Sequence, residues 1–202
     1  MKIKICGLKY ANNIEAVSKL NVDFLGFIFY KNSPRVVTEL PDCVKKLPQK
    51  RVGVFVNDTI ENIMELKQKY NLDFIQLHGN EDVRFTKRIN DYTNVIKAFS
   101  IDEYFNFKYL NKYKDIVSHF LFDTESKSYG GSGKKFDWNI LVKYILDVPF
   151  FLSGGIAEND ADKIKNLNLK TLYGVDINSC FEDNIGIKNI QKIKKFSTTL
   201  RT

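Results

Sequence analysis

Eight short apolar runs, each followed by a stretch of roughly helical length, recur along the whole 202-residue chain. The runs are rich in valine, isoleucine, phenylalanine and leucine, as expected of parallel strands that are buried on both faces. This alternation predicts β–α repetition with right-handed crossovers, which leaves an open doubly wound sheet or a closed barrel. The predicted strands are residues 3–6, 24–29, 51–56, 74–77, 95–99, 120–123, 149–153 and 171–177.

The positions of the glycines distinguish these two architectures. An open sheet usually carries a GxGxxG fingerprint after its first strand, but here the first strand ends in Cys6-Gly7 without one. The glycine-rich turns follow the sixth and seventh strands instead. Eight units and late glycines predict an α/β fold in which residues 1–202 form a single (β/α)8 barrel, a compact TIM barrel with short helices and loops.

Helix signals occur between the strands. Asp58 or Thr59 is placed to cap a helix that begins near Ile60, and Asn159 or Asp160 is placed to open another short helix. Near the C-terminus, isoleucines at helical spacing predict an amphipathic helix whose solvated face is lysine-rich. The lysines of that predicted face are Lys188, Lys192, Lys194 and Lys195.

The net charge of +7 does not indicate a nucleic-acid partner, because the lysines are spread along the whole chain. A mild basic bias suits an anionic small-molecule substrate. Three widely spaced cysteines and two histidines form no zinc-ligand pattern and predict free thiols without a metal site. The apolar stretches are too short to cross a bilayer, and the chain enters a strand at once, so we expect a cytoplasmic protein that contacts no membrane.

In such a barrel the C-terminal ends of the strands build the active site. Gly154 and Gly155 follow the seventh strand, and Asn178 and Ser179 follow the eighth. Glycines there let the backbone approach an anion, and loops after the last two strands bind phosphate in many barrels. Two unrelated tight turns are the alternative, but adjacent strands favour a phosphate site.

Two groups at strand ends are candidates for acid–base chemistry. Asp123 ends the hydrophobic sixth strand, where a buried carboxylate suits a general acid, although an aspartate that caps the loop is an alternative. Cys6 ends the first strand and by its residue type alone fits a small buried hydrophobic side chain better than a catalyst. Its neighbours in the sequence include no evident group that would lower its pKa.

Arg35 and His78 are further candidates at strand ends. Arg35 follows the second strand, behind a stiffening proline, and could present its guanidinium to a carboxylate or simply lie in solvent. His78 shows no carboxylate partner in the sequence, so we expect a supporting residue. A glycine-rich loop within residues 125–135 could close over a ligand.

Taken together, these motifs resemble the phosphoribosylanthranilate isomerase family. The resemblance covers almost the whole chain in order, and KICG, the long block from residue 122 and LSGG in one chain are highly specific. The matching stretches are KICGL at 4–8, GFIFYKNSPR at 26–35, RVGVFVN at 51–57, IQLHG at 75–79, IKAF at 96–99, FDTESKSYGGSGKKFDW at 122–138, FLSGGI at 151–156 and GVDINS at 174–179.

The resemblance implies an Amadori rearrangement of N-(5-phosphoribosyl)anthranilate to 1-(2-carboxyphenylamino)-1-deoxyribulose 5-phosphate. It implies Asp123 as the general acid at the ribose ring oxygen and Cys6 as the general base at C2. It also places Arg35 near the anthranilate carboxylate and Asp176 near the substrate. The phosphate would lie among Gly154, Gly155, Asn178 and Ser179. Neither a metal nor an organic cofactor is expected, and the enzyme is expected to be a monomer.

Two positions depart from the family pattern. Lys9 stands where threonine is usual, and Cys180 stands where glycine is usual. We expect Cys180 at negative φ, where it needs no glycine-like conformation. The sister sugar isomerase of histidine biosynthesis, the nearest alternative function, generally uses aspartates at the ends of strands one and five, where this chain has Cys6 and Ser100. A catalytically inactive binding barrel is the other alternative, and it would be expected to lack Cys6 or Asp123.

Overall fold

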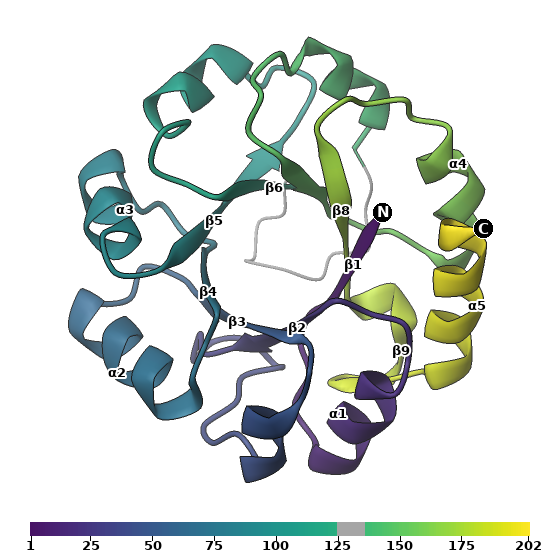
Figure 1. The fold of residues 1–202 in the computed structure, drawn as a ribbon. Helices are drawn as coiled ribbons and strands as arrows, with labels where there is room; N and C mark the ends of the chain where they lie inside the picture. Colours follow the sequence, from purple (N-terminus) through teal and green to yellow (C-terminus); the bar gives the residue numbers. More distant parts are fainter. Residues whose placement is uncertain (125–135) are drawn as a thin grey trace.

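A computed structural model describes residues 1–124 and 136–202. Its eight parallel strands close into a barrel in sequence order, and helical segments surround them as a ring (Figure 1). The predicted (β/α)8 barrel is therefore confirmed, and no predicted strand boundary is wrong by more than two residues. The strands are β1 (Lys2–Ile5), β2 (Phe24–Ile28), β3 (Lys50–Phe55), β4 (Phe74–Leu77), β5 (Asn94–Ile101), β6 (His119–Thr124), β7 (Phe150–Leu152) and β8 (Leu172–Ile177).

The connections are short, as predicted, and several contain 3-10 turns where a longer barrel would have α-helices. Such turns follow β2, β5 and β6: η1 (Asp42–Lys46), η2 (Phe107–Lys112) and η3 (Trp138–Lys143). Two more, η4 (Glu158–Asp160) and η5 (Ser179–Phe181), follow β7 and β8. The α-helices of the described residues are α1 (Ala11–Ser18), α2 (Ile60–Tyr70), α3 (Val83–Asn90), α4 (Ala161–Lys165) and α5 (Ile190–Arg201).

The helix starts were predicted closely. Thr59 is the N-cap of α2, because its hydroxyl accepts a hydrogen bond from the Asn62 N–H at 3.2 Å. Asp160 directly precedes α4, but its carboxylate accepts from the Ala157 N–H at 2.6 Å and so stabilises the turn before the helix. None of the described helices is long and apolar enough to span a bilayer.

One part of the C-terminal prediction is wrong. Lys188 does not lie on the solvated face of a helix; it belongs to β10 (Ile187–Lys188), which pairs antiparallel with β9 (Glu182–Asn184), and it is 1% exposed. Helix α5 begins only at Ile190, after the Asn189 side chain caps its first turn. The helix predicted from the isoleucine spacing therefore began two residues too early. It included part of a hairpin whose turn contains Gly186 at φ +80°.

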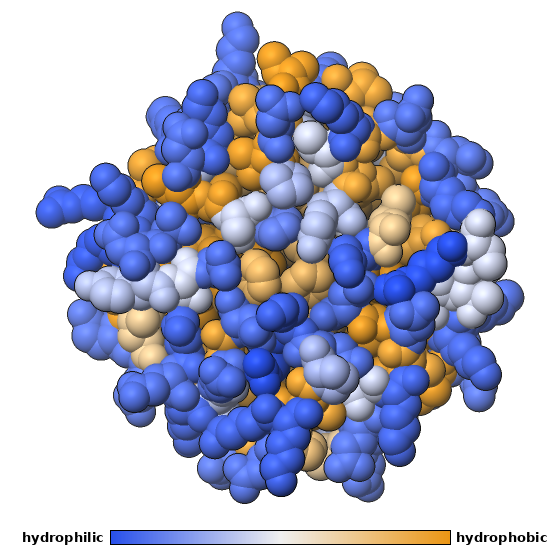
Figure 2. All heavy atoms as spheres, viewed as in Figure 1, coloured by the Kyte–Doolittle hydropathy of each residue, from blue (hydrophilic) through white to orange (hydrophobic). Residues whose placement is uncertain are grey.

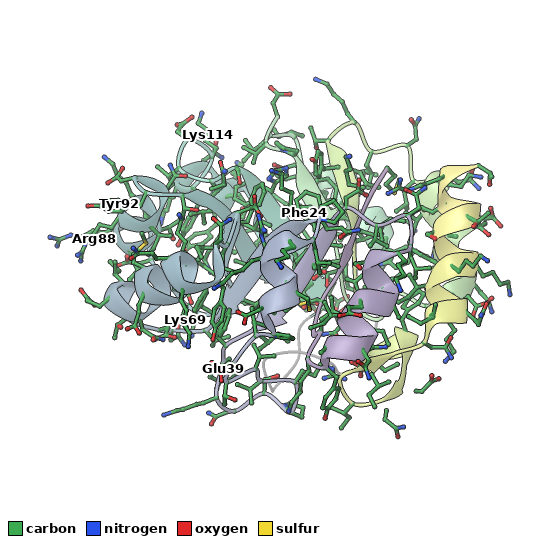
Figure 3. The ribbon with its side chains drawn as sticks, turned by 60° about the horizontal axis from the view of Figure 1, so that its bottom comes forward. Phe24, Glu39, Lys69, Arg88, Tyr92 and Lys114 are labelled. Carbon is green, nitrogen blue, oxygen red and sulfur yellow. The ribbon has the colours of Figure 1, made fainter. Side chains whose placement is uncertain are left out.

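The core has two layers. The larger one lies between the barrel and the surrounding helices, and the smaller one fills the barrel interior with side chains that include Phe24, Leu121 and Phe151. Figure 3 shows the molecule from the side, with Phe24 near its middle, Lys114 (before β6) at one end and Glu39 (after β2) at the other. The end toward Glu39 is therefore the one at which the strands finish. The view of Figure 2 shows mostly hydrophilic side chains on the surface, with hydrophobic ones between them.

Strand β1 shows how the two layers are sorted by alternation. Ile3 and Ile5 belong to the layer beneath the helices. Lys4 and Cys6 lie on the opposite face of the strand, inside the barrel, where they are 0% and 4% exposed. The barrel interior thus becomes polar and charged toward the ends at which the strands finish.

Candidate active site

One cavity at the C-terminal end of the barrel brings together every site residue that the sequence predicted. The residues come from the ends of six strands, β1, β2, β4, β6, β7 and β8, as the rule for such barrels requires. The structure places them side by side, while their individual roles stay predictions. The nine predicted site residues, all of which are among those that line the cavity, are Cys6, Arg35, His78, Asp123, Gly154, Gly155, Asp176, Asn178 and Ser179.

The turn after β7 brings main chain close to β6. Gly154 and Gly155 both have positive φ, +88° and +63°. A Cβ on Gly154 would lie 2.6 Å from the Thr124 nitrogen and 3.0 Å from Asp123 Oδ1, so only glycine fits this approach. The predicted glycine turn therefore lies directly against the predicted general acid.

Cys180 lies in η5 and lines the cavity together with Ser179. The non-glycine residues with positive φ in the described part of the chain are Asn57, Asn71 and Asn168. Cys180 is not among them, so its expected negative φ is confirmed and its side chain causes no backbone strain there.

Cys6 lies beside two charged groups inside the barrel. The Lys4 ammonium forms a 2.8 Å ion pair with Asp176 Oδ1, and both side chains are almost fully buried. Burial raises the pKa of the Cys6 thiol, and the charge of the Lys4 ammonium opposes this. A group that favours the thiolate is therefore present, two residues before Cys6 in the sequence.

His78 has a carboxylate partner that the sequence does not reveal. Its Nε2 lies 3.3 Å from Asp123 Oδ2, and both side chains are 19% exposed. The other ring nitrogen, Nδ1, lies 2.7 Å from the Gln76 carboxamide nitrogen. Gln76, His78 and Asp123 thus form a chain of polar contacts from β4 to β6, with the Asp123 carboxylate at the cavity end.

The loop that carries His78 is anchored by a buried carboxylate. Glu81 accepts hydrogen bonds from the Asn57 N–H at 2.8 Å and from the Gly79 N–H at 3.0 Å. It also pairs with the Lys97 ammonium at 2.9 Å, and both side chains are 2% exposed. Three neighbouring strands, β3, β4 and β5, are therefore joined at their ends, which limits the positions open to His78.

Arg35 is buried and paired, rather than exposed to solvent. Its Nε and Nη2 donate to the two carboxylate oxygens of Glu182 at 2.9 Å and 2.6 Å, a bidentate contact that raises the pKa of the guanidinium. Lys188 donates to Glu182 at 2.7 Å and to Asn178 Oδ1 at 2.6 Å. Arg35 and Asn178, predicted for the two ends of the substrate, are thus connected through the β9–β10 hairpin.

Apolar side chains form another part of the cavity wall. Ile28, Val54 and Val56 line it from β2 and β3, and Pro34 lies beside Arg35. The cavity therefore combines a wall that suits a flat ring with a guanidinium next to it.

Sequence reasoning missed three residues of this site. Lys4 could have been found, because residues two apart on a strand share a face and Cys6 was already a candidate. Lys188 was assigned to a helix, and Glu182 carried no local signal, since its partner Arg35 lies 147 positions away in the sequence. The glycine-rich loop predicted to close over a ligand falls within residues 125–135, outside the described residues.

Comparison with known proteins agrees with this geometry. The sequence model of the N-(5'phosphoribosyl)anthranilate (PRA) isomerase family matches residues 3–199. Proteins named N-(5'-phosphoribosyl)anthranilate isomerase from Parabacteroides distasonis and Caldanaerobacter subterraneus are 44% and 38% identical to this chain. The alignments cover 97% and 100% of this chain and 91% and 98% of those relatives.

Solved structures lead to the same family. The phosphoribosyl anthranilate isomerase of Thermotoga maritima superposes with a TM-score of 0.86 at 28% identity, over 100% of this chain and 98% of that one. A structure of the enzyme with reduced 1-(o-carboxyphenylamino)-1-deoxyribulose 5-phosphate matches over the same shares, with a TM-score of 0.83 at 26% identity. Because the sequence match, the relatives and the shared fold all extend over nearly the whole chain, this protein belongs to the N-(5'-phosphoribosyl)anthranilate isomerase family.

Proposed function

We propose that the cavity at the C-terminal end of the barrel carries out the reaction of this family with Cys6 and Asp123 as its base and acid. The reaction is the rearrangement of the aldosylamine N-(5-phosphoribosyl)anthranilate to the ketose 1-(2-carboxyphenylamino)-1-deoxyribulose 5-phosphate, an aldose–ketose isomerisation. The observation that carries the proposal is that groups for each part of this substrate line a single cavity.

The substrate would bind by its two charged ends and its ring. Its phosphate fits the turn at Gly154 and Gly155, with Asn178 and Ser179 on the adjacent strand end supplying polar groups. The anthranilate carboxylate fits beside the Arg35 guanidinium, and the aromatic ring fits the apolar wall formed by β2 and β3. The ribose then lies between, over Asp176 and the end of β1.

The chemistry needs an acid and a base at different places around the sugar. Asp123, on β6, protonates the ribose ring oxygen, and the ring opens to an iminium. Cys6, at the end of β1, removes the proton from C2, which gives an enolamine that becomes the ketose. The two residues come from strands separated by β7 and β8 in the barrel, so they approach the sugar from different sides (Figure 1).

The proposal extends to the state of the protein. We infer that residues 1–202 form one barrel domain that works as a cytoplasmic monomer. Sedimentation equilibrium checks the monomer directly: a mass near 23.4 kDa at all loading concentrations supports it, and a mass that doubles with concentration contradicts it.

A coupled assay with freshly generated N-(5-phosphoribosyl)anthranilate tests the activity. Cys6→Ser and Asp123→Asn should each lower kcat by about a hundredfold or more, the scale of general acid–base catalysis, with circular dichroism unchanged. Cys43→Ser, in η1 outside the cavity, and Asp147→Asn, at an exposed carboxylate, are matched controls that should leave kcat as it is. Near wild-type turnover in Cys6→Ser or Asp123→Asn would exclude that residue from the chemistry.

A further inference from the structure

Lys4 and Cys6 share a small space inside the barrel that a glycine leaves open. A Cβ on Gly26, on the neighbouring strand β2, would lie 3.1 Å from Cys6 Sγ and 3.1 Å from Lys4 Nζ. Both polar atoms therefore border the same gap, which places the Lys4 ammonium next to the Cys6 sulfur. Any side chain larger than that of glycine at position 26 would compete for the place where the two groups meet.

The Lys4 ammonium is fixed from its other side by Asp176. Strands β1 and β8 pair in parallel with Lys4 opposite Asp176, and the two side chains meet at 2.8 Å. Lys4 is 0% exposed, so no water competes for its charge. Burial favours a neutral amine, yet Asp176 and Cys6 together raise the pKa of Lys4 above its ordinary value, which keeps the ammonium charged.

The charges around Cys6 act on the thiol in opposite directions. Burial raises the pKa of the thiol most strongly, Lys4 lowers it, Asp176 raises it and Lys188 lowers it. A thiol in this position ionises at a usable pH only if a cation lies next to it. Lys4 is the cation that borders the same gap as the sulfur, and Lys188 also lowers the pKa of the thiol through its charge.

We propose that Lys4 is a positioning residue that stabilises the thiolate form of Cys6, and that Asp176 holds the Lys4 ammonium in the place where it does so. The thiol proton leaves to water as the thiolate forms. The thiolate then accepts the C2 proton of the substrate and becomes a thiol again. The assignment of Cys6 as the base rests on the proposed function, but the effect of Lys4 on the thiol does not.

The pH dependence of Cys6 alkylation by iodoacetamide tests this without any substrate. Mass spectrometry of the peptide that contains Cys6 separates its reaction from those of Cys43 and Cys180. Lys4→Met should move the midpoint of the alkylation profile up by about one pH unit or more, which is about a tenfold slower reaction at pH 8. Asp176→Asn should move the midpoint down, because it removes a negative charge while its amide oxygen still accepts a hydrogen bond from Lys4.

Lys97→Met is the matched control. Lys97 is another buried lysine, paired with Glu81 at 2.9 Å, but it lies on β5 and is not among the groups that act on Cys6. Its loss perturbs the barrel to a similar degree and should leave the alkylation midpoint of Cys6 unchanged. A shift in this variant equal to that of Lys4→Met would mean that loosened packing, and not charge, controls the thiol, and would overturn the proposal.

Two further results would overturn it: an unchanged midpoint in Lys4→Met, or shifts of the same sign in Lys4→Met and Asp176→Asn. If Lys4→Met unfolds because Asp176 is left unpaired, Lys4→Met/Asp176→Asn removes that problem and should have a higher midpoint than Asp176→Asn alone.

Isomerase kinetics separate this proposal from the proposed function. In an active enzyme the pH profile of kcat/KM should shift upward in Lys4→Met together with the alkylation profile. If the alkylation midpoints shift as expected but the wild-type chain does not turn over the substrate, the role of Lys4 stands and the proposed function fails. If turnover is normal and the midpoints do not move, the reverse holds.

Discussion

Arg35 lines the cavity, and one edge of its guanidinium is already hydrogen-bonded within the protein. Glu182 takes the Nε–Nη2 edge, and none of the described residues accepts a hydrogen bond from Nη1. A carboxylate that approaches from the cavity can therefore bind the remaining donors without displacing Glu182. The bidentate pair also restricts the side chain to one rotamer, which lowers the entropy lost on binding a ligand.

Arg35→Ala should weaken the binding of a product analogue that carries the carboxylate by about tenfold to a hundredfold. This is the value of a charge-assisted hydrogen bond of about 1.5–3 kcal/mol. An analogue without the carboxylate should bind nearly as it does to the wild type. Isothermal titration calorimetry with both analogues measures the difference. Arg51→Ala, which removes an arginine equally buried against Asp73 at 2.9 Å but outside the cavity, should change neither affinity. Equal losses of affinity for the two analogues in Arg35→Ala would show that Arg35 does not bind the carboxylate.

At this scale the site residues that gather in the cavity could be predicted from the sequence, but the side chains that pair with them could not. Cys6 and Asp123 were identifiable because they end apolar strands, and all such ends converge in a barrel. The pairs His78–Asp123 and Arg35–Glu182 join segments far apart in the chain, and their geometry depends on side-chain rotamers that no local pattern encodes. Lys4 is the exception, because its relation to Cys6 follows from strand alternation alone.

Among the elements, the turn after β7 and the end of β6 approach each other closely beside the cavity. Gly154 has a positive φ, and a Cβ at this residue would also lie only 2.6 Å from the Thr124 main-chain nitrogen. The two strand ends can approach this closely only without a side chain, and the approach sets the distance between the proposed phosphate turn and Asp123.

Gly154→Ala should therefore lower the free energy of unfolding by about 2 kcal/mol or more and raise KM for the substrate, because the turn must move away from β6. Gly186→Ala is the control, since Gly186 also has positive φ, but a Cβ there meets no atom closer than 3.5 Å. Gly186→Ala should lose only the stability that the positive φ costs a residue with a side chain. Chemical denaturation compares the free energies of unfolding of the two variants. A loss in Gly154→Ala no larger than in Gly186→Ala would contradict the close approach.

The elements also show where pattern reading succeeds. The eight strands were predictable because both faces are buried, so each appears as an apolar run between polar segments. The 3-10 turns after β2, β5 and β6 were not, because segments of five or six residues are too short for helical periodicity to be resolved. The β9–β10 hairpin was missed because its lysine is buried by an ion pair, whereas lysine in a polar segment normally indicates solvent.

For the molecule as a whole, His119 makes stability depend on acidic pH through its surroundings in the barrel interior. Its ring packs against Tyr173 at 4.5 Å and Phe151 at 5.4 Å, and burial lowers its pKa to about 4. Its Nδ1 is buried and has no hydrogen-bond partner among the described residues. The folded protein therefore disfavours the protonated ring, whereas the unfolded chain accepts a proton near pH 6.5.

Between these two pKa values the unfolded state binds more protons, so stability should fall as the pH drops from 6.5 toward 4. His119→Phe should remove this part of the dependence, because phenylalanine fits among the aromatic rings and cannot be protonated. Urea unfolding at pH 7.5 and pH 5 measures it: the wild type should lose about 1 kcal/mol more than the variant, after allowance for the partial exposure of the ring. Identical losses in the two proteins would show that His119 carries no such effect.

The pairing of β1 with β8 has a consequence for how the chain acquires its site during translation. The first strand emerges from the ribosome long before its partner, since Lys4 and Asp176 are separated by 172 positions. Until β8 is made, β1 has an open edge and Lys4 has no carboxylate, so Cys6 is exposed in a half-built sheet. The hairpin with Glu182 and Lys188 is synthesised still later, so Arg35 has no carboxylate partner until then. The barrel therefore closes and the catalytic pocket is completed within the last stretch of synthesis, and a nascent chain stalled before residue 172 would hold most of the hydrophobic core but none of the assembled chemistry.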